Sequence, residues 1–522
     1  MKGFVFSMDE KNQKMHKTIF HTTEKSNFIL NMTYEQFNKF ASYSLIIGFI
    51  ILSVISCATE LIACKASTIG TKGGPLWEDF ENSEFIYSIF HDWRALPSFA
   101  LAVVGILGAS IFIIALIKQT LTKKQVIPCI AVLVMFIFMY ISSLNSFSGI
   151  PDYTWFLGYR FSRYEGFMTY LSYMLIFLGG ISISDKAAVK RIFDAFIIII
   201  SVQCIWSALQ WIPSFPGFYH SLMYEANSNL NLPSGTTGSP IFLVSLLSVG
   251  LSIALAGSCS DESAKRRLLY KIAIVPFAFF MIKTQTLIGL ISATVITVTF
   301  FIITIISKKK KSAEFKPYVS LLLMIGGFAA ALLIIFITGF KIYDGSIMWQ
   351  DGFKRLYSFG EYRFKEDHPF EIDNISSLYS YLWDKAFEYI KKFPVIGVGP
   401  DGFIIPQMDP DPGLMLSGYK PDFTFDRPYN EYLFYAASFG IPFCISFVAA
   451  IVYSLVNAVK QAAKFFSQKT DWIFCGVLIS IVSYIFISVI NTSSPTVSPF
   501  IWLILGISCS SLKKSEEQKV HS

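Results

Sequence analysis

One long hydrophilic stretch, residues 341–430, combines aromatic rings with fixed positive charges. The rings are Tyr343, Trp349, Phe353, Tyr357, Phe359, Tyr362, Phe364 and Phe370, and the cations among them are Lys354, Arg355, Arg363 and Lys365. Flat apolar rings pack against sugar faces, and guanidinium groups hold phosphates through paired hydrogen bonds. The stretch therefore suits a ligand with both sugar and phosphate groups. An aromatic belt at a membrane surface is the alternative explanation for any single ring.

The elements that position this stretch are apolar. The AVILMFWYC set makes up 53% of the 522 residues and only 15% are charged, which excludes an ordinary cytosolic enzyme. Twelve stretches are candidates to span a bilayer as helices, approximately 43–64, 96–117, 126–143, 166–183, 192–212, 241–257, 268–282, 286–307, 318–340, 433–458, 472–490 and 499–511. The sequence thus predicts an all-α integral membrane protein with about 12 transmembrane helices.

The basic residues are distributed unevenly between the two sides of these spans. With both termini cytoplasmic, the cytoplasmic segments hold 27 Lys and Arg, with Lys271 at the cytoplasmic end of the seventh span included, and the short outer loops hold six. Because cytoplasmic loops are enriched in Lys and Arg, this difference predicts the orientation. It places cytoplasmic tails at 1–42 and 512–522, spans at 43–340 and 431–511, and a large periplasmic loop at 341–430.

Several other classes of function lack support in the sequence. The six His are scattered and no Cys-x-x-Cys occurs, so we expect no metal and no cofactor. The net charge of +7 reflects cytoplasmic Lys and Arg beside the lipid bilayer, so we expect no nucleic-acid partner. A carrier made of two six-span halves would divide after the sixth span, whereas the long loop here follows the ninth.

Apolar residues within the large loop recur at spacings of three and four, namely Ile375, Leu378, Leu382, Ala386 and Ile390. This spacing predicts one amphipathic helix, from a Ser376 cap up to Pro394, lying on the membrane surface or over a cavity. The segment Gly397-Val-Gly399-Pro-Asp401-Gly402 follows it. It predicts a tight turn in which backbone approaches a ligand or a neighbouring helix.

Two stretches resemble the O-antigen ligase and O-antigen polymerase family. Trp383-Asp-Lys-Ala386 through Phe393-Pro-Val-Ile-Gly-Val-Gly-Pro-Asp-Gly-Phe403 is similar to the family's helical Trp and Ala before a Pro-x-x-Gly-Val-Gly turn. Arg427-Pro-Tyr-Asn430-Glu-Tyr-Leu, with Gly440-Ile-Pro after it, is similar to the family's His-Asn-x9-Gly signature. Gly158-Tyr-Arg160-Phe-Ser-Arg163-Tyr-Glu165-Gly166 is a weaker likeness. The resemblance covers roughly residues 150–460.

The chain departs from the family at two places. Tyr429 replaces the signature His, and Thr284-Gln285-Thr286 replaces a common Ser-Arg at the start of the eighth span. The acceptor or the catalytic group can therefore differ from those of the family.

The resemblance implies a metal-independent glycosyltransferase of bacterial polysaccharide or lipopolysaccharide biosynthesis. It implies an undecaprenyl-pyrophosphate-linked glycan donor and a hydroxyl acceptor at the periplasmic face of the inner membrane. Loss of a pyrophosphate builds negative charge that Arg side chains can stabilise. The candidates for donor binding are Arg160, Arg163, Arg355, Arg363 and Arg427, and the candidates for substrate contact are Trp383 and Asp401. For each Arg taken singly, an ion pair or a lipid-headgroup contact is the alternative.

Three residues are candidates for the catalytic group. Tyr429 occupies the position of the family's His, but an unperturbed phenol has a pKa of about 10 and is a poor base near neutrality. His368 lies in the same loop, and an unperturbed His has a pKa of about 6.5. Asn430 can cap the following helix and hold a hydroxyl.

The acceptor stays open at this stage. It can be lipid A–core, as for a ligase, or a growing glycan, as for a polymerase, and replacement of the signature His favours the polymerase. A protein O-oligosaccharyltransferase would use the same donor. A lipid-linked oligosaccharide flippase or other transporter is the alternative from a different class, against which the long outer loop argues.

Overall fold

A computed structural model describes residues 31–70, 95–144, 156, 164–210, 233–259, 263–309, 317–338, 375–400, 402–403, 427–468 and 472–511. These residues form helices and connecting segments and contain no strand. The prediction of an all-α protein is therefore confirmed for the part of the chain that the structure describes.

The helices follow the apolar stretches of the sequence. In chain order they are α3 (Tyr34–Gly70), α6 (Leu96–Ile117), η2 (Lys123–Gln125), α7 (Val126–Leu144), α9 (Phe167–Ser182), α10 (Lys186–Leu209), α11 (Pro240–Ser258), α12 (Ala264–Lys283), α13 (Leu287–Lys309), α14 (Pro317–Thr338), α16 (Ile375–Lys392), α18 (Glu431–Phe439), α19 (Ile441–Gln468), α20 (Ile473–Ile487) and α21 (Ser498–Ser508).

Eight of the described helices are long and apolar enough to cross a membrane by length and composition, namely α3, α6, α7 with η2, α10, α11, α13, α14 and α19. Three more, α9, α20 and α21, are apolar but shorter. Helix α12 carries Lys265, Arg266 and Arg267 in its first turn. Each of the twelve predicted stretches overlaps a helix, and the structure supports a multi-span membrane protein.

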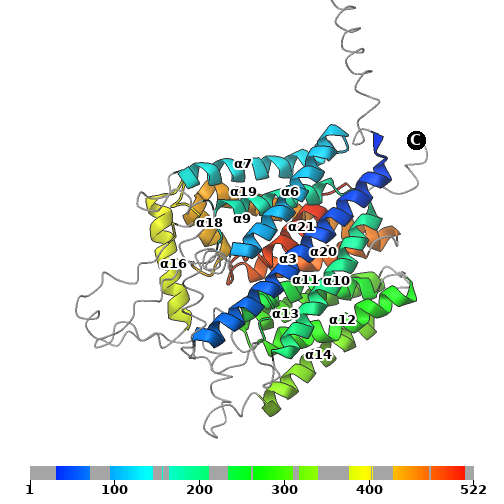
Figure 1. Cartoon of the computed structure of the whole chain (residues 1–522). Coiled ribbons are helices and arrows are strands. Elements are labelled where there is room, and N and C mark those ends of the chain that lie inside the picture. The colour runs from blue at the N-terminus through cyan, green and yellow to red at the C-terminus, as the bar shows by residue number, and fades with distance from the viewer. Residues whose placement is uncertain are drawn as a thin grey trace, which may run out of the picture.

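The long helices lie side by side in a bundle, and α16 lies across one end of it beside α18 (Figure 1). We call this end of the molecule the α16 end. Helix α11 is central, since 89% of its most apolar 18-residue stretch is buried. Helix α14 is peripheral, since only 22% of the corresponding stretch is buried. Close approach of α6 and α9 depends on Gly108, where a Cβ would lie 2.5 Å from the Leu175 carbonyl oxygen.

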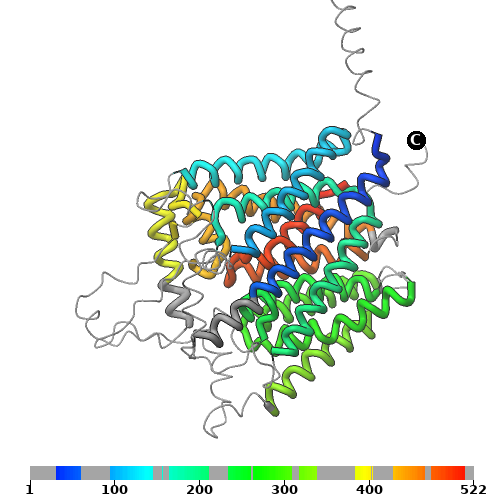
Figure 2. The backbone as a smooth tube through the Cα atoms, viewed as in Figure 1, coloured from blue at the N-terminus to red at the C-terminus, as the bar shows by residue number. Residues whose placement is uncertain are grey.

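The tenth predicted span, 433–458, is wrong in one respect, because the helix breaks at Gly440. Gly440 has φ 90° and ψ 162°, a conformation in which the helix cannot continue. Its N–H still bonds the Ala436 carbonyl, whereas the next N–H, of Ile441, bonds the Pro394 carbonyl at 2.8 Å. The nine-residue α18 is thus a separate element that precedes α19, and α16 and α18 lie at the same end of the bundle (Figure 2).

Candidate functional site

Residues 427–433 resemble the family signature, and we call them the signature segment. This segment leads into a capped helix. Asn430 has an extended backbone, and its Oδ1 accepts a hydrogen bond from the Leu433 N–H at 3.0 Å, which caps α18. Tyr429, just before it, is half-buried and has φ 47°. A left-handed backbone is uncommon for a bulky residue, so the surrounding contacts must hold this turn in place.

The two stretches of the resemblance pack directly on each other. The Val398 N–H bonds the Ala437 carbonyl at 3.0 Å, and the Gly399 N–H bonds the Ser438 carbonyl at 2.8 Å. A Cβ on Gly397, whose φ is 64°, would lie 2.4 Å from the Ser438 carbonyl oxygen. The predicted tight turn thus brings its backbone against the end of α18, which is a neighbouring helix.

Helix α16 is fixed to the same unit. The Trp383 indole N–H donates to the Pro428 carbonyl at 3.0 Å, while Leu382 and Ala386 are fully buried. The Tyr389 ring lies 5.4 Å from the ring of Phe403, centroid to centroid. Trp383 therefore supports the signature segment from outside, and its predicted contact with substrate stays a prediction.

Arg427 lies in a buried ion pair rather than on an open surface. It is 4% exposed, and its guanidinium lies 2.8 Å from the carboxylate of Glu165, which is 5% exposed. The same guanidinium donates to Thr492 Oγ1 at 2.8 Å and to the Ser493 carbonyl at 3.0 Å, and it stacks 5.0 Å from the Phe434 ring centroid. Arg427 thus joins the start of α9, the loop after α20 and the entrance of α18.

A second carboxylate, Glu431, lies beside this pair with a different set of partners. Its Oε1 accepts from the Tyr435 hydroxyl at 2.7 Å and its Oε2 from the Tyr484 hydroxyl at 2.8 Å. Its backbone N–H bonds the Ser488 carbonyl at 2.8 Å. Burial raises the pKa of the Glu431 carboxyl to about 7, against the two tyrosine hydrogen bonds and the charge of Arg427, which lower it.

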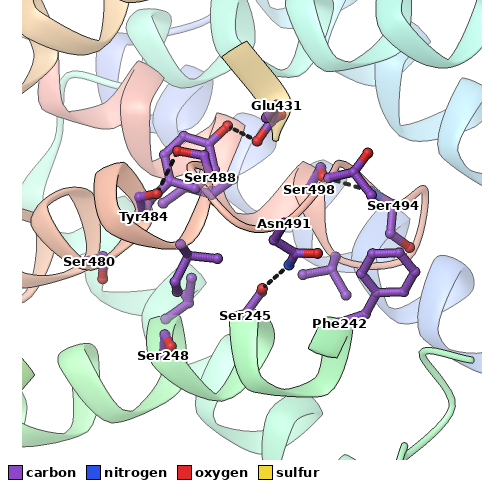
Figure 3. A pocket seen from close by; sticks show the side chains of 15 residues that line it. Phe242, Ser245, Ser248, Glu431, Ser480, Tyr484, Ser488, Asn491, Ser494 and Ser498 are labelled. Atoms are coloured by element: carbon purple, nitrogen blue, oxygen red, sulfur yellow. Dashed lines mark hydrogen bonds between the residues drawn. The ribbon is translucent and has the colours of Figure 1, made fainter. Parts of the chain in front are cut away.

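A small cavity of about 30 Å³ opens next to Glu431, between α11, α20 and the segment that leads into α21 (Figure 3). Apolar atoms make up most of its lining surface, and the hydroxyl and amide groups among them include those of Ser245, Ser248, Ser480, Ser488, Asn491 and Ser498. We call it the serine cavity. The Asn491 amide nitrogen donates to Ser245 Oγ at 2.8 Å across it.

The structure brings together part of the predicted site. Arg427, Tyr429 and Asn430 lie with Glu431 in the five-residue segment 427–431 at the α16 end, and Trp383 contacts the same segment. The remaining predicted site residues lie outside the described residues, namely Arg160, Arg163, Arg355, Arg363, His368 and Asp401. Their roles stay predictions.

Sequence reasoning did not single out Glu165 and Glu431 as partners in the site. Both are acids at the entrance of apolar stretches in a chain with few charges, and ionisable groups in such places mark functional sites. That signal could have found the two carboxylates. Their partners could not have been found in this way, because Ser493 lies 328 residues from Glu165 along the chain and Tyr484 lies 53 residues from Glu431.

No group of three His, Cys, Asp or Glu side chains that could hold a metal ion occurs within the described ranges. Arg427, the tyrosine hydroxyls and the hydroxyl groups of the serine cavity are among the groups that could contact an anionic or hydroxyl-bearing ligand there. The arrangement provides a buried cation, two carboxylates in different environments and a small cavity with several hydroxyl groups in its lining.

Residues 272–448 match the profile of the O-antigen ligase family. No curated protein and no solved structure matches the chain. The matched stretch contains both the 394–399 turn and the signature segment with α18, so the family resemblance is confirmed there, while Glu165 and most of the serine cavity lie outside it. Residues 272–448 of this multi-span membrane protein are therefore similar to the O-antigen ligase family.

Proposed function

We propose that the protein transfers or polymerises a glycan from an undecaprenyl-pyrophosphate donor onto a hydroxyl acceptor at the periplasmic face of the bacterial inner membrane. The observation that carries this proposal is the direct packing of the 394–399 turn on α18 within the matched O-antigen ligase domain. Both stretches belong to one rigid unit, which can hold a donor and an acceptor in a fixed relative position.

The proposed chemistry needs cations and a place for a proton. Negative charge develops on the pyrophosphate as it leaves, and preorganised Arg side chains stabilise it. Arg427 already has Glu165 as its partner, so we propose that the outer Arg residues at 160, 163, 355 and 363 supply most of the contacts with the donor.

A gel of surface polysaccharide from a deletion strain tests the function and separates its variants. Single-repeat caps in place of long chains are expected if the protein is a polymerase, which replacement of the signature His favours. Long chains that stay unattached indicate a ligase, and loss of glycoprotein bands indicates a protein O-oligosaccharyltransferase. Unchanged polysaccharide and glycoprotein, or lipid-linked glycan trapped on the cytoplasmic leaflet as for a flippase, would contradict the proposal.

The orientation follows from the distribution of Lys and Arg, with both termini cytoplasmic and 341–430 periplasmic. We expect an alkaline phosphatase reporter, which works only after export, to be active when fused after Gly360. The same reporter fused after Lys311 should be inactive, because the run Lys308–Lys311 is expected to be cytoplasmic. Activity at Lys311 together with silence at Gly360 would reverse the orientation.

Removal of one positive charge from the proposed donor site should lower the rate of glycan transfer strongly. Arg163→Ala and Arg363→Ala should each lower transfer about a hundredfold, since one lost bond to developing negative charge costs about 3 kcal/mol of barrier. The measurement is transfer from a lipid-pyrophosphate donor by purified protein at equal membrane abundance. Lys391→Ala, which removes one charge from the last turn of α16, is the matched control and should keep the parent rate. Parent rates in both Arg variants would remove them from the site.

A further inference from the structure

Two buried carboxylates lie at the α16 end in contrasting environments. Glu165 has a guanidinium at 2.8 Å, so its negative charge is neutralised by Arg427. Glu431 is 2% exposed and its oxygens accept hydrogen bonds from neutral donors, the hydroxyls of Tyr435 and Tyr484. Pairs of carboxyl groups whose environments differ in this way often divide acid and base roles between them.

The charged groups that face Glu431 do not hold it in one protonation state. Arg427 favours its ionised form and Glu165 disfavours it, while Tyr435 on α18 and Tyr484 on α20 stabilise the carboxylate by hydrogen bonds. Burial outweighs these contributions and raises the pKa of Glu431 to about 7. The group can therefore gain or lose a proton near neutral pH, which an ordinary carboxyl group does not.

The serine cavity connects Glu431 with buried polar atoms that need partners. Asn491 is 3% exposed and Ser480 is 1% exposed, yet neither Asn491 Oδ1 nor Ser480 Oγ has a hydrogen-bond partner among the described protein groups. Both line the cavity together with Glu431 and Tyr484. Buried polar groups of this kind are satisfied by internal water where there is room for it. Water in the serine cavity would give the Glu431 carboxyl a path for protons.

We propose that Glu431 takes up the proton of the acceptor hydroxyl through water in the serine cavity, an inference that rests on the proposed function. The acceptor oxygen forms a bond to the anomeric carbon of the donor sugar, and the bond from that carbon to the pyrophosphate oxygen breaks with its electron pair. The proton of the acceptor passes through water to the Glu431 carboxylate and later returns to the cavity water. Glu431 lies one residue after Asn430 and two after Tyr429, within the signature segment.

The first test is the rate of transfer by Glu431→Gln as a function of pH. In the parent the rate should fall about tenfold for each pH unit below about 7, because only the carboxylate accepts a proton. Glu431→Gln keeps the shape of the side chain but cannot accept the proton. It should be at least a hundredfold slower. Its rate should also lack the acid limb, which is the fall in rate below about pH 7. His368→Ala should keep the acid limb.

The second test uses Tyr484→Phe, which keeps the carboxyl and removes the hydrogen bond to Oε2. Because this bond favours the carboxylate, its loss should raise the pKa of Glu431 and move the acid limb about one pH unit upwards. Tyr453→Phe also loses a tyrosine hydrogen bond, from its hydroxyl to the Lys124 carbonyl at 2.6 Å. As the matched control it should leave the limb where it is.

The third test does not depend on activity. Infrared difference spectra of the purified protein between pH 5 and pH 9 should contain one protonated-carboxyl band that titrates near neutral pH and is absent from Glu431→Gln. The proposal is overturned by parent spectra without such a band, by an acid limb that persists in Glu431→Gln, or by one that only His368→Ala removes. If the parent transfers no glycan, the proposed function fails. The titration then separately shows whether Glu431 exchanges protons.

Discussion

Arg427→Ala should be among the most destabilising single substitutions in the described part of the chain. Removing one partner of a buried ion pair leaves an uncompensated charge and typically costs about 3–5 kcal/mol. Here the loss would leave the Glu165 carboxylate buried, and Thr492 Oγ1 and the Ser493 carbonyl without their donor. The measurement is thermal denaturation of the detergent-solubilised protein, followed by loss of monomer in gel filtration.

The exposed pair of Lys385 and Glu388 on α16 provides the control. Lys385 Nζ lies 2.9 Å from Glu388 Oε2, a distance close to that in the buried pair. The Lys385 side chain is 33% exposed, however, and that of Glu388 is 65% exposed. An exposed ion pair contributes at most about 1 kcal/mol, so Lys385→Ala should denature close to the parent temperature. Equal shifts for Lys385→Ala and Arg427→Ala would contradict the importance of burial.

A double variant separates the structural role of Arg427 from its predicted role in donor binding. Arg427→Met with Glu165→Leu replaces the pair by apolar side chains of similar volume, which is often neutral or stabilising. If this variant is as stable as the parent and still transfers glycan, Arg427 has no contact with the donor. If it is stable but inactive, the guanidinium or its carboxylate partner is needed for the reaction itself.

The helices could be predicted from the sequence because length and hydropathy define them locally. The stretches predicted at 96–117 and 126–143 agree within one residue with α6 and with α7 (Val126–Leu144). The amphipathic spacing likewise predicts α16, which ends at Lys392 before Pro394. The break at Gly440 was missed, because apolar residues continue on both sides of it and only the Gly-Ile-Pro sequence indicates an interruption.

The site itself depends on contacts that no periodic pattern encodes. Glu165 and Arg427 are far apart in the chain, and Arg427 also bonds two residues of the loop between α20 and α21. Sequence reasoning identified Arg427 as a cation but gave no basis for choosing between an ion pair and a ligand contact. The serine cavity depends in the same way on the packing of α11 against α20, which brings Ser245 to Asn491.

The contact between the 394–399 turn and α18 predicts a second large effect, from adding a single methyl group. A Cβ at Gly440 would lie 2.0 Å from the Val395 carbonyl oxygen, and φ 90° with ψ 162° is a conformation that is essentially restricted to glycine. Gly397→Ala meets the same obstacle, with 2.4 Å to the Ser438 carbonyl oxygen and φ 64°. Each substitution should cost about 3 kcal/mol, because the turn must move off α18 and lose its backbone hydrogen bonds.

Gly326→Ala is the matched control for these two variants. A Cβ at this position on α14 meets no atom within 4 Å, and the helix is regular there. Alanine is favoured over glycine inside a helix by up to about 1 kcal/mol, so Gly326→Ala should denature at or slightly above the parent temperature. Gly440→Ala and Gly397→Ala should also lose glycan transfer at temperatures where they are still folded, because the turn and the signature segment then separate. Retention of full transfer by both variants would mean that the packing of the turn on α18 is not required for the reaction, and would remove the observation on which the proposed function depends.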